Sequence, residues 1–214
     1  MPVENEPQKP RMAIVTNVSG RFMEFKDDIF ENRRVYAQKY GYEAINVEGR
    51  VDHSREPSWD KVLIAKSVLP YYEWVFWTDA DAIITKFDRE LERFLSDSHE
   101  IVISGVVLEP PNWCNCGMVF LHNSEWTRDF LERLVKAGKS RRGCGLWEGS
   151  SFHRLLEDDP KLETNIKFDM VAPFNCLWLK ERKYGFITHF NGIDWDERTR
   201  LMRDAFAAAR AQYG

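Results

Sequence analysis

Residues 75–84, VFWTDADAII, contain two apolar runs that flank a pair of aspartates. The first run is aromatic and β-branched, which predicts a buried strand. Carboxylates at the end of a buried strand cost free energy unless a positive group lies beside them. Alternate residues of an extended chain point to the same face, so Asp79 and Asp81 can face one cation. The stretch therefore predicts a Mg²⁺ or Mn²⁺ site at the carboxyl end of a central strand, where open α/β sheets bind ligands.

A solvated turn that happens to hold two aspartates is the alternative interpretation of this stretch. Asp-x-Asp is a common tripeptide, and by itself it favours the solvated turn. The flanking residues favour the metal, because the pair interrupts a strongly hydrophobic segment that is preceded by Tyr71, Tyr72 and Trp74.

The composition is that of a globular protein with one core. The chain has 214 residues, enough for one large domain, and 43% of them are hydrophobic, enough to supply its core. The net charge of −4 implies no general affinity for nucleic acid. No apolar run reaches the ~20 residues that cross a bilayer, and the first residues lack the apolar core of a signal peptide. We therefore expect a disordered lead over residues 1–11, one domain over residues 12–214, no nucleic-acid partner and no membrane span.

The four cysteines lack the spacing of a zinc site, which needs pairs separated by two to four residues. Two of them, Cys114 and Cys116, are not expected to bridge each other. Reduced thiols in a cytosolic setting are the expected state, and disulfides are the alternative. The other two cysteines are Cys144 and Cys176.

Strands alternate with helices along the chain. This order predicts an α/β sandwich with a mostly parallel central sheet flanked by helices. Gly41 is expected to end the first helix, and loops are expected over residues 112–117 and 138–149. Strands are predicted at residues 12–17, 43–47, 75–78, 101–106, 118–122 and 186–190, and helices at 22–40, 59–69, 87–95, 126–136, 150–156 and 198–211.

Two features on the amino-terminal side predict contacts with a nucleotide. The first strand ends in a polar turn that holds Thr16, Asn17, Ser19 and Gly20, and α/β proteins often bind a nucleotide there; an ordinary β–α loop is the alternative. Lys61 lies in the first turn of a predicted helix, where the helix dipole disfavours a cation. A bound phosphate would reverse that cost, and a solvated lysine is the alternative.

Five segments in a fixed order carry a family resemblance. They are residues 32–42 (NRRVYAQKYGY), 59–61 (WDK), 77–84 (WTDADAII), 115–126 (NCGMVFLHNSEW) and 189–192 (HFNG). Together they resemble the signatures of GT-A fold glycosyltransferases. The group they are similar to contains galactomannan galactosyltransferases, fungal Golgi mannosyltransferases and xyloglucan xylosyltransferases. The resemblance runs from about residue 12 to about residue 195.

The resemblance implies a Rossmann-like GT-A sandwich with a mixed sheet and a sugar-transfer activity. The donor would be a nucleotide-sugar, a UDP-sugar in particular, and the transferred group a hexose or pentose. The acceptor would be an oligosaccharide, glycoprotein or glycolipid, and the anomeric configuration would be retained. The resemblance also implies that Asp79 and Asp81 hold Mn²⁺, or Mg²⁺, against the diphosphate, with His189 as a third ligand. A divalent ion would neutralise the charge of such a leaving group, although a lone histidine at a strand end is more often structural.

The resemblance also assigns contacts with the donor. Asn115 and Gly117 would line the pocket for the donor sugar, because glycine lets the backbone approach closely. Thr16 and Asn17 would lie near the uracil and ribose. The remaining donor contacts that it implies are Lys61, Asp79, Ala80 and Gly192.

One departure concerns the catalytic residues. The family has an acidic residue followed by glutamine and serine, and here residues 148–150 are Glu-Gly-Ser. Glu148 keeps the acidic role and, with Asp79, is a predicted catalytic residue. Glycine in place of glutamine leaves open which group stabilises the reacting face.

A second departure concerns location. The family's members are anchored in the Golgi, whereas this sequence shows no anchor. We expect a cytoplasmic enzyme, of a bacterium or of the host cell if viral, or a domain excised from a longer enzyme.

Two other classes of protein compete with the glycosyltransferase. A nucleotidyltransferase that makes nucleotide-sugars would carry a glycine-rich basic loop after the first strand, and residues 17–21 are a poor version of one. A non-catalytic module that binds a sugar or nucleotide is the other class. The presence of Asp79, Asp81 and His189 counts against it, because such a module need not keep costly carboxylates.

Overall fold

The computed structural model describes residues 9–105, 114–139, 148–170, 172–177 and 185–213. Most of the predicted lead, the predicted loop over 140–147 and Cys144 lie outside these ranges. At the start of the described part, the backbone of Arg11 already accepts a hydrogen bond from Glu73 N at 2.8 Å. None of the described helices is long and apolar enough to span a bilayer.

A six-stranded sheet with the order β2-β1-β3-β6-β5-β7 forms the centre of the fold. Among these strands β6 runs against its neighbours β3 and β5, while the other pairs are parallel. The mostly parallel mixed sheet predicted from the sequence is therefore confirmed. The strands are β1 (Met12–Val18), β2 (Glu43–Glu48), β3 (Trp74–Thr78), β5 (Ile101–Gly105), β6 (Cys114–His122) and β7 (Ile166–Asp169).

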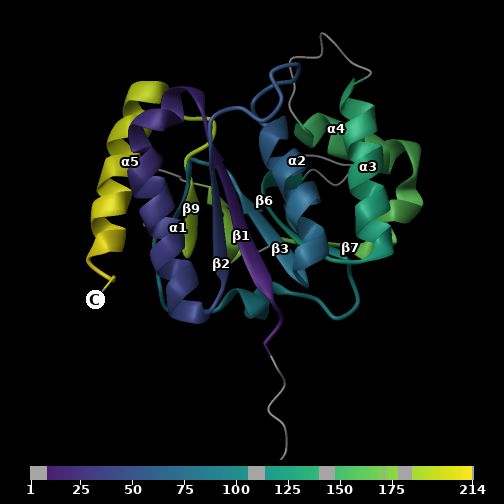
Figure 1. Ribbon diagram of the computed structural model, residues 1–214, viewed down its shortest axis with the longest axis horizontal. Helices are drawn as coiled ribbons and strands as arrows, with labels where there is room; N and C mark the ends of the chain where they lie inside the picture. The colour runs from purple at the N-terminus through teal and green to yellow at the C-terminus, as the bar shows by residue number, and fades with distance from the viewer. Residues whose placement is uncertain (1–8, 106–113, 140–147, 171, 178–184, 214) are drawn as a thin grey trace, which may run out of the picture.

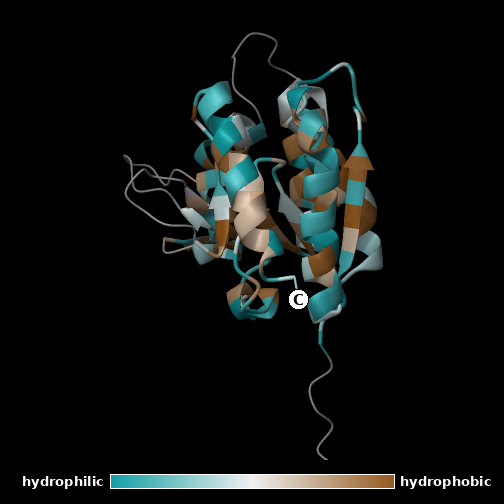
Figure 2. Ribbon diagram, turned by 90° about the vertical axis from the view of Figure 1, so that its left-hand side faces the viewer, coloured by the Kyte–Doolittle hydropathy of each residue, from teal (hydrophilic) through white to brown (hydrophobic). Residues whose placement is uncertain are grey.

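Helices cover both faces of this sheet (Figure 1). Helices α2 (Trp59–Val68), α3 (Glu125–Lys139) and α4 (Glu148–Asp158) pack on one face, and α1 (Lys26–Tyr40) and α5 (Trp195–Arg210) lie on the other side. Hydrophilic and hydrophobic residues alternate along the covering helices (Figure 2), as expected for elements with one buried side.

The alternation of side chains along β3 divides the core into two parts. Val75 and Trp77 pack in the cluster under α2, α3 and α4. Phe76 packs in the cluster on the α1 side and stacks on Phe120, with a ring-centroid distance of 4.1 Å. Because both faces of β3 are covered, the strand reads as a continuous apolar run. Burying each of these large side chains stabilises the fold by roughly 1.5–3 kcal/mol.

A small second sheet joins distant parts of the chain on the α1 side. It has the order β4-β9-β8, with β4 (Ala82–Ile84) antiparallel to β9 (Ile187–His189) and β8 (Cys176–Leu177) parallel to it. Ala82 pairs with His189, so the chain just after Asp81 lies beside the late histidine. This pairing joins two of the sequence motifs into one site.

Three of the predicted elements need correction. The helix predicted at 87–95 is wrong, because only a 3₁₀ turn forms at Leu91–Phe94. The carbonyl of Phe87 accepts from Lys39 and Tyr40 at 2.7 Å, so side chains of α1 take the place of helical N–H donors. The predicted loops at 112–117 and 138–149 are wrong where they overlap β6 and the ends of α3 and α4. Strands β4, β7 and β8 were not predicted, because they are short and are set by pairing with neighbouring strands.

A buried arginine holds the turn between β3 and β4. Arg33 of α1 is fully buried, and its guanidinium donates to the hydroxyls of Thr16 and Thr78 and to the backbone oxygens of Asp79 and Ala82. Burial lowers the pKa of Arg33 to about 10, so it stays charged at neutral pH. The guanidinium therefore satisfies carbonyl groups directly beneath the two aspartates.

We expect Arg33→Lys to lower the free energy of unfolding by about 1–3 kcal/mol, because an ammonium cannot reproduce the planar set of donors and leaves buried acceptors unpaired. Chemical denaturation followed by circular dichroism measures this. Arg34→Lys is the matched control, since Arg34 is exposed and contacts only Gln38 among the described residues, at 3.5 Å. Equal midpoints for the two variants would contradict the role given to Arg33.

Candidate active site

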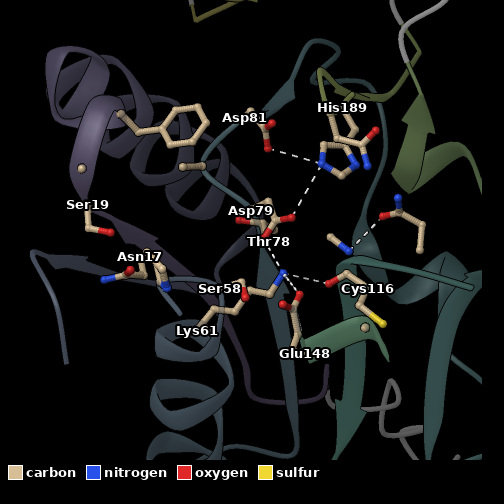
Figure 3. A pocket seen from close by; sticks show the side chains of 18 of the residues that line it. Asn17, Ser19, Ser58, Lys61, Thr78, Asp79, Asp81, Cys116, Glu148 and His189 are labelled. Carbon is tan, nitrogen blue, oxygen red and sulfur yellow. Dashed lines mark hydrogen bonds and ion pairs between the residues drawn. The ribbon is translucent and has the colours of Figure 1, made fainter. Parts of the chain in front are cut away.

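A hollow of about 650 Å³ opens at the carboxyl ends of β1 and β3. Its lining comes from segments far apart in the sequence, as Figure 3 shows. Most of the residues predicted for the site line it together. These are Asn17, Lys61, Asp79, Ala80, Asp81, Asn115, Gly117, Glu148, His189 and Gly192.

Thr16 is the one predicted donor contact that does not line the hollow. Its hydroxyl lies 2.5 Å from that of Thr78 and accepts from Arg33 Nε at 3.2 Å. Successive residues of a strand point to opposite faces, so Asn17 reaches the hollow while Thr16 points toward α1. Asn17 Nδ2 donates to the backbone oxygens of Val47 and Gly49 at 3.3 and 2.9 Å. Thr16 thus supports the site from behind.

Two aspartates and a histidine form a cluster in this hollow. His189 Nε2 lies 3.3 Å from Asp81 Oδ1 and 3.7 Å from Asp79 Oδ2. The three ligand atoms all lie within 4.8 Å of one another. The aspartates are on the tight turn between β3 and β4, where Ala82 N donates to Asp79 O at 3.2 Å. Both carboxylates nevertheless face His189, as predicted for a shared cation.

A chain of amides fixes the orientation of the histidine ring. Gly117 N donates to Asn115 Oδ1 at 2.9 Å, and Asn175 Nδ2 donates to the same oxygen at 3.0 Å. That orientation leaves Asn175 Oδ1 to accept from His189 Nδ1 at 3.1 Å. With the proton on Nδ1, a neutral imidazole presents the lone pair of Nε2 to the two carboxylates. Asn175 is therefore placed as the partner that holds the tautomer of a metal-binding histidine in known metal sites.

Nε2 of His189 faces both carboxylates, and in the neutral imidazole its lone pair is free to bind a divalent cation that the carboxylates also bind. Nε2 is buried and has no hydrogen-bond partner among the described residues. Such a group costs free energy unless a ligand satisfies it. Two carboxylate oxygens and an imidazole nitrogen suit Mn²⁺ and, less well, Mg²⁺. The residues present therefore fit the ion that the sequence predicted.

The two carboxyl groups have different electrostatic environments. Burial raises the pKa of Asp79, and the charges of Lys61 and His189 only partly offset it. Burial also acts to raise the pKa of Asp81, but His189 and Arg198 outweigh it and hold that pKa below its usual value. Arg198 Nη1 lies 3.2 Å from Asp81 Oδ2, the oxygen that does not face His189. Each aspartate thus has a basic partner of its own.

Lys61 is the partner of Asp79. Its ammonium contacts Asp79 Oδ1, lies 2.7 Å from Glu148 Oε1 and donates to the backbone oxygen of Cys116 at 3.0 Å. Burial acts to lower the pKa of Lys61, but the two carboxylates outweigh it and raise the pKa above its usual value. Trp77 Nε1 donates to the same Cys116 oxygen at 2.9 Å. The three donors of Lys61 therefore meet three protein acceptors.

A bulge in β6 brings Asn115 and Gly117 into the site. One step along β5, from Ile103 to Ser104, corresponds to four steps along β6, from Val119 to Asn115. The extra residues turn the strand, and Gly117 O accepts from Asp79 N at 2.8 Å. Bulges commonly redirect side chains next to active sites. Here the bulge connects the aspartate turn to the amides that orient His189.

Sequence reasoning missed two residues of this site. Asn175 lies in a segment, residues 157–185, for which no element was predicted. Arg198 was placed only as the start of a helix. Neither belongs to a motif with a recognisable spacing. The one available signal for Arg198 was its position nine residues after His189, within reach of the same strand end.

We expect Gly117→Ala to weaken Mn²⁺ binding at least tenfold. A Cβ at this position would overlap the ring of His189 and lie 2.9 Å from Asn115 Oδ1, which would displace the histidine. Calorimetric titration of Mn²⁺ measures the loss. Gly149→Ala is the matched control in the same hollow, because its Cβ would meet Cys116 Sγ at an ordinary 3.7 Å. Unchanged Mn²⁺ affinity in Gly117→Ala would contradict the assigned position of His189.

Comparisons with known proteins agree with this geometry. Residues 8–113, just under half of the chain, match the family model of the galactosyl transferase GMA12/MNN10 family. Probable glycosyltransferase 6 of Oryza sativa is 26% identical over 167 residues, which cover 74% of this chain and 34% of the relative. Xyloglucan 6-xylosyltransferase 1 of Arabidopsis thaliana is 26% identical over 196 residues, which cover 84% of this chain and 41% of the relative. The chain thus spans about a third to two-fifths of the length of these relatives.

Solved structures establish the fold. A glycosyltransferase involved in glycosylation of the major capsid of PBCV-1 superposes with a TM-score of 0.74 at 14% identity, covering 91% of this chain and 100% of that one. The galactosyltransferase LgtC, solved in complex with donor and acceptor sugar analogs, superposes with a TM-score of 0.59 at 10% identity, covering 94% and 96%. The chain therefore has the GT-A fold and resembles the GMA12/MNN10 family of glycosyltransferases.

Proposed function

We propose that this chain is a metal-dependent glycosyltransferase that moves a hexose or pentose from a UDP-sugar to a glycan acceptor. The observation that carries the proposal is the buried Nε2 of His189, which has no hydrogen-bond partner in the described part of the chain and lies 3.7 Å from Asp79 Oδ2 and 3.3 Å from Asp81 Oδ1. This cluster lies in a hollow at the carboxyl ends of the strands of a GT-A sheet. The arrangement suits a substrate that brings a diphosphate to a divalent cation.

The cation and the protein would divide the stabilisation of the leaving group between them. Asp79, Asp81 and His189 would hold Mn²⁺ or Mg²⁺, which supplies Lewis-acid neutralisation of a developing diphosphate charge. Asn175 keeps His189 in the tautomer that can bind the ion, and Lys61 holds the carboxylate of Asp79 in place. These contacts pre-organise the site, which lowers the reorganisation needed during reaction.

The donor assignment is supported by the relatives. One relative is named a xyloglucan 6-xylosyltransferase, and the superposed LgtC was solved with donor and acceptor sugar analogs. Asn17 near the end of β1 and Asn115 in β6 both line the hollow, in keeping with the predicted contacts for the nucleoside and the sugar. The acceptor we propose is an oligosaccharide, glycoprotein or glycolipid.

Glu148 is the side chain that we propose acts at the reacting face, in a transfer that retains the anomeric configuration. It stands in the first turn of α4 and lines the hollow, and only 5% of the residue is exposed. Oε1 pairs with Lys61, while Oε2 is buried and has no hydrogen-bond partner among the described residues. A carboxylate oxygen in this position can stabilise positive charge that develops on the anomeric carbon. We therefore assign Glu148 to the reacting face, where Gly149 offers no side chain.

We expect UDP and Mn²⁺ to bind cooperatively, because the carboxylates of Asp79 and Asp81 and the diphosphate each need the same cation. Titrating UDP calorimetrically in Mn²⁺ and in excess chelator tests this, and the affinity should be at least tenfold higher with metal. A screen of nucleotide-sugars with Mn²⁺ and no acceptor should then show slow hydrolysis of one of them. Equal UDP affinity in both conditions would contradict the metal bridge, and binding without hydrolysis or transfer would favour a non-catalytic module.

We expect Asp81→Asn to abolish most metal-dependent donor turnover and to lower the free energy of unfolding of the metal-free protein by roughly 1–3 kcal/mol at pH 7. The lowered pKa of Asp81 means that its ionised form stabilises the fold. This contribution is present above the unfolded-state pKa and is lost as pH falls through the folded-state pKa. The stability difference from wild type should therefore shrink in acid. Asp204→Asn is the control, because Asp204 is an exposed partner of Arg200. Full activity of Asp81→Asn would remove the aspartate pair from the site.

A further inference from the structure

Arg198 is a cation of the hollow that neither the aspartate motif nor the late histidine motif contains. It lies one turn into α5, and its side chain is 18% exposed. Nη1 contacts Asp81 Oδ2 at 3.2 Å, and Nη2 donates to the backbone oxygen of Ile193 at 2.9 Å. Nε is buried and has no hydrogen-bond partner among the described residues. Nε is thus a desolvated donor, and an acceptor beside it would lower its free energy.

The other cations near the aspartates are already committed. Lys61 uses its three donors on Asp79, Glu148 and the Cys116 oxygen. Arg33 lies beneath the turn and is fully buried, with its donors on hydroxyl and carbonyl groups. Arg198 differs from both, because it lines the hollow and its Nε has no hydrogen-bond partner in the described part of the chain.

The charges in the hollow favour a cationic side chain that can bind phosphate oxygens. Among the described lining residues around the cluster, Asp79, Asp81 and Glu148 carry three negative charges, and Lys61 and Arg198, which pair with them, carry two positive ones. Arg21 also lines the hollow, and its guanidinium lies 5.6 Å from the ring centroid of Trp195. A divalent ion would over-balance the three carboxylates, and a nucleoside diphosphate would restore the negative charge. A guanidinium pairs well with phosphate oxygens because its planar donors match two of them at once.

We propose that Arg198 binds the diphosphate of the donor nucleotide. In the structure described here its guanidinium is a counter-ion of Asp81; with a divalent ion on Asp81, the same group would turn a share of its donors toward the phosphates. Arg198 would therefore couple the two ligands: it would compete with the metal for Asp81 when no nucleotide is bound, and it would favour the nucleotide once the metal is bound. This inference rests on the proposed function.

The test is calorimetric and uses UDP, uridine and Mn²⁺ as separate probes. With Mn²⁺ present, Arg198→Gln should bind UDP about tenfold or more weakly than wild type, as expected for the loss of a charge-assisted hydrogen bond. Uridine, which has no phosphate, should bind both equally. Without nucleotide, Arg198→Gln should bind Mn²⁺ as tightly as wild type or more tightly, because a competing cation has been removed from Asp81.

Two further variants keep the test interpretable. Arg200→Gln removes the same charge from the same helix at an exposed position, where Arg200 pairs with Asp204 at 3.3 Å, and it should leave UDP affinity unchanged. Arg198→Lys keeps the charge, and it should recover part of the UDP affinity if Arg198→Gln proves too unstable to measure. Thermal melting of each variant reports its folding.

The outcomes separate the hypotheses. If the wild-type chain and Arg198→Gln bind UDP equally well in Mn²⁺, this inference alone is overturned. The inference is also overturned if Arg198→Gln loses as much affinity for Mn²⁺ without nucleotide as it loses for UDP. Arg198 would then only position Asp81. A wild-type chain that binds no UDP in Mn²⁺ overturns the proposed function and this inference together.

Discussion

The placement of two carboxylates, one buried and one half-buried, on one tight turn is the constraint on which the rest of the site depends. Asp79 and Asp81 leave the sheet between β3 and β4, and each needs a positive partner to offset desolvation. Lys61 of α2 serves Asp79, and Arg198 of α5 serves Asp81. Helices from the two sides of the sheet are thereby tied to the same turn. Between them Nε2 of His189 has no hydrogen-bond partner among the residues that the structure describes, so the three ligand atoms could hold a further cation.

Arg33 has a different role in this arrangement. It contacts the backbone of the turn and leaves the carboxylate oxygens to the hollow. Its donors hold the peptide groups of Asp79 and Ala82 from below, so the side chains above can change partners without moving the chain. Arg33 thus fixes the backbone of the turn, while the carboxylates of Asp79 and Asp81 face the hollow. Pre-organised sites hold their ligand-binding groups in this way.

Much of the fold could be read from the sequence, because its signals are local. The apolar run of β3, the amphipathic pattern of α1 and the left-handed Gly41 at its end, with φ of 79°, each act within a few residues. The two aspartates and His189 belong to recognisable motifs, and the structure brings them together as the sequence predicted. Asn175, Arg198 and the bulge of β6 could not be predicted, because each is defined by its contacts with chain segments distant in sequence. The 3₁₀ turn at Leu91–Phe94 was missed for the same reason: carbonyls ahead of it are held by side chains of α1.

The pairing of β4 with β9 also governs how the protein can fold. Ala82 meets His189 across a loop of more than a hundred residues, and closing such a loop costs entropy before any contact offsets it. The sheet from β1 to β3 and its helices can form from nearer contacts, whereas the cluster of Asp79, Asp81 and His189 needs β9 in place. During synthesis the chain therefore carries Asp79 and Asp81 without their late partners until the carboxyl-terminal segment emerges. The candidate site is the last part of this arrangement to be completed.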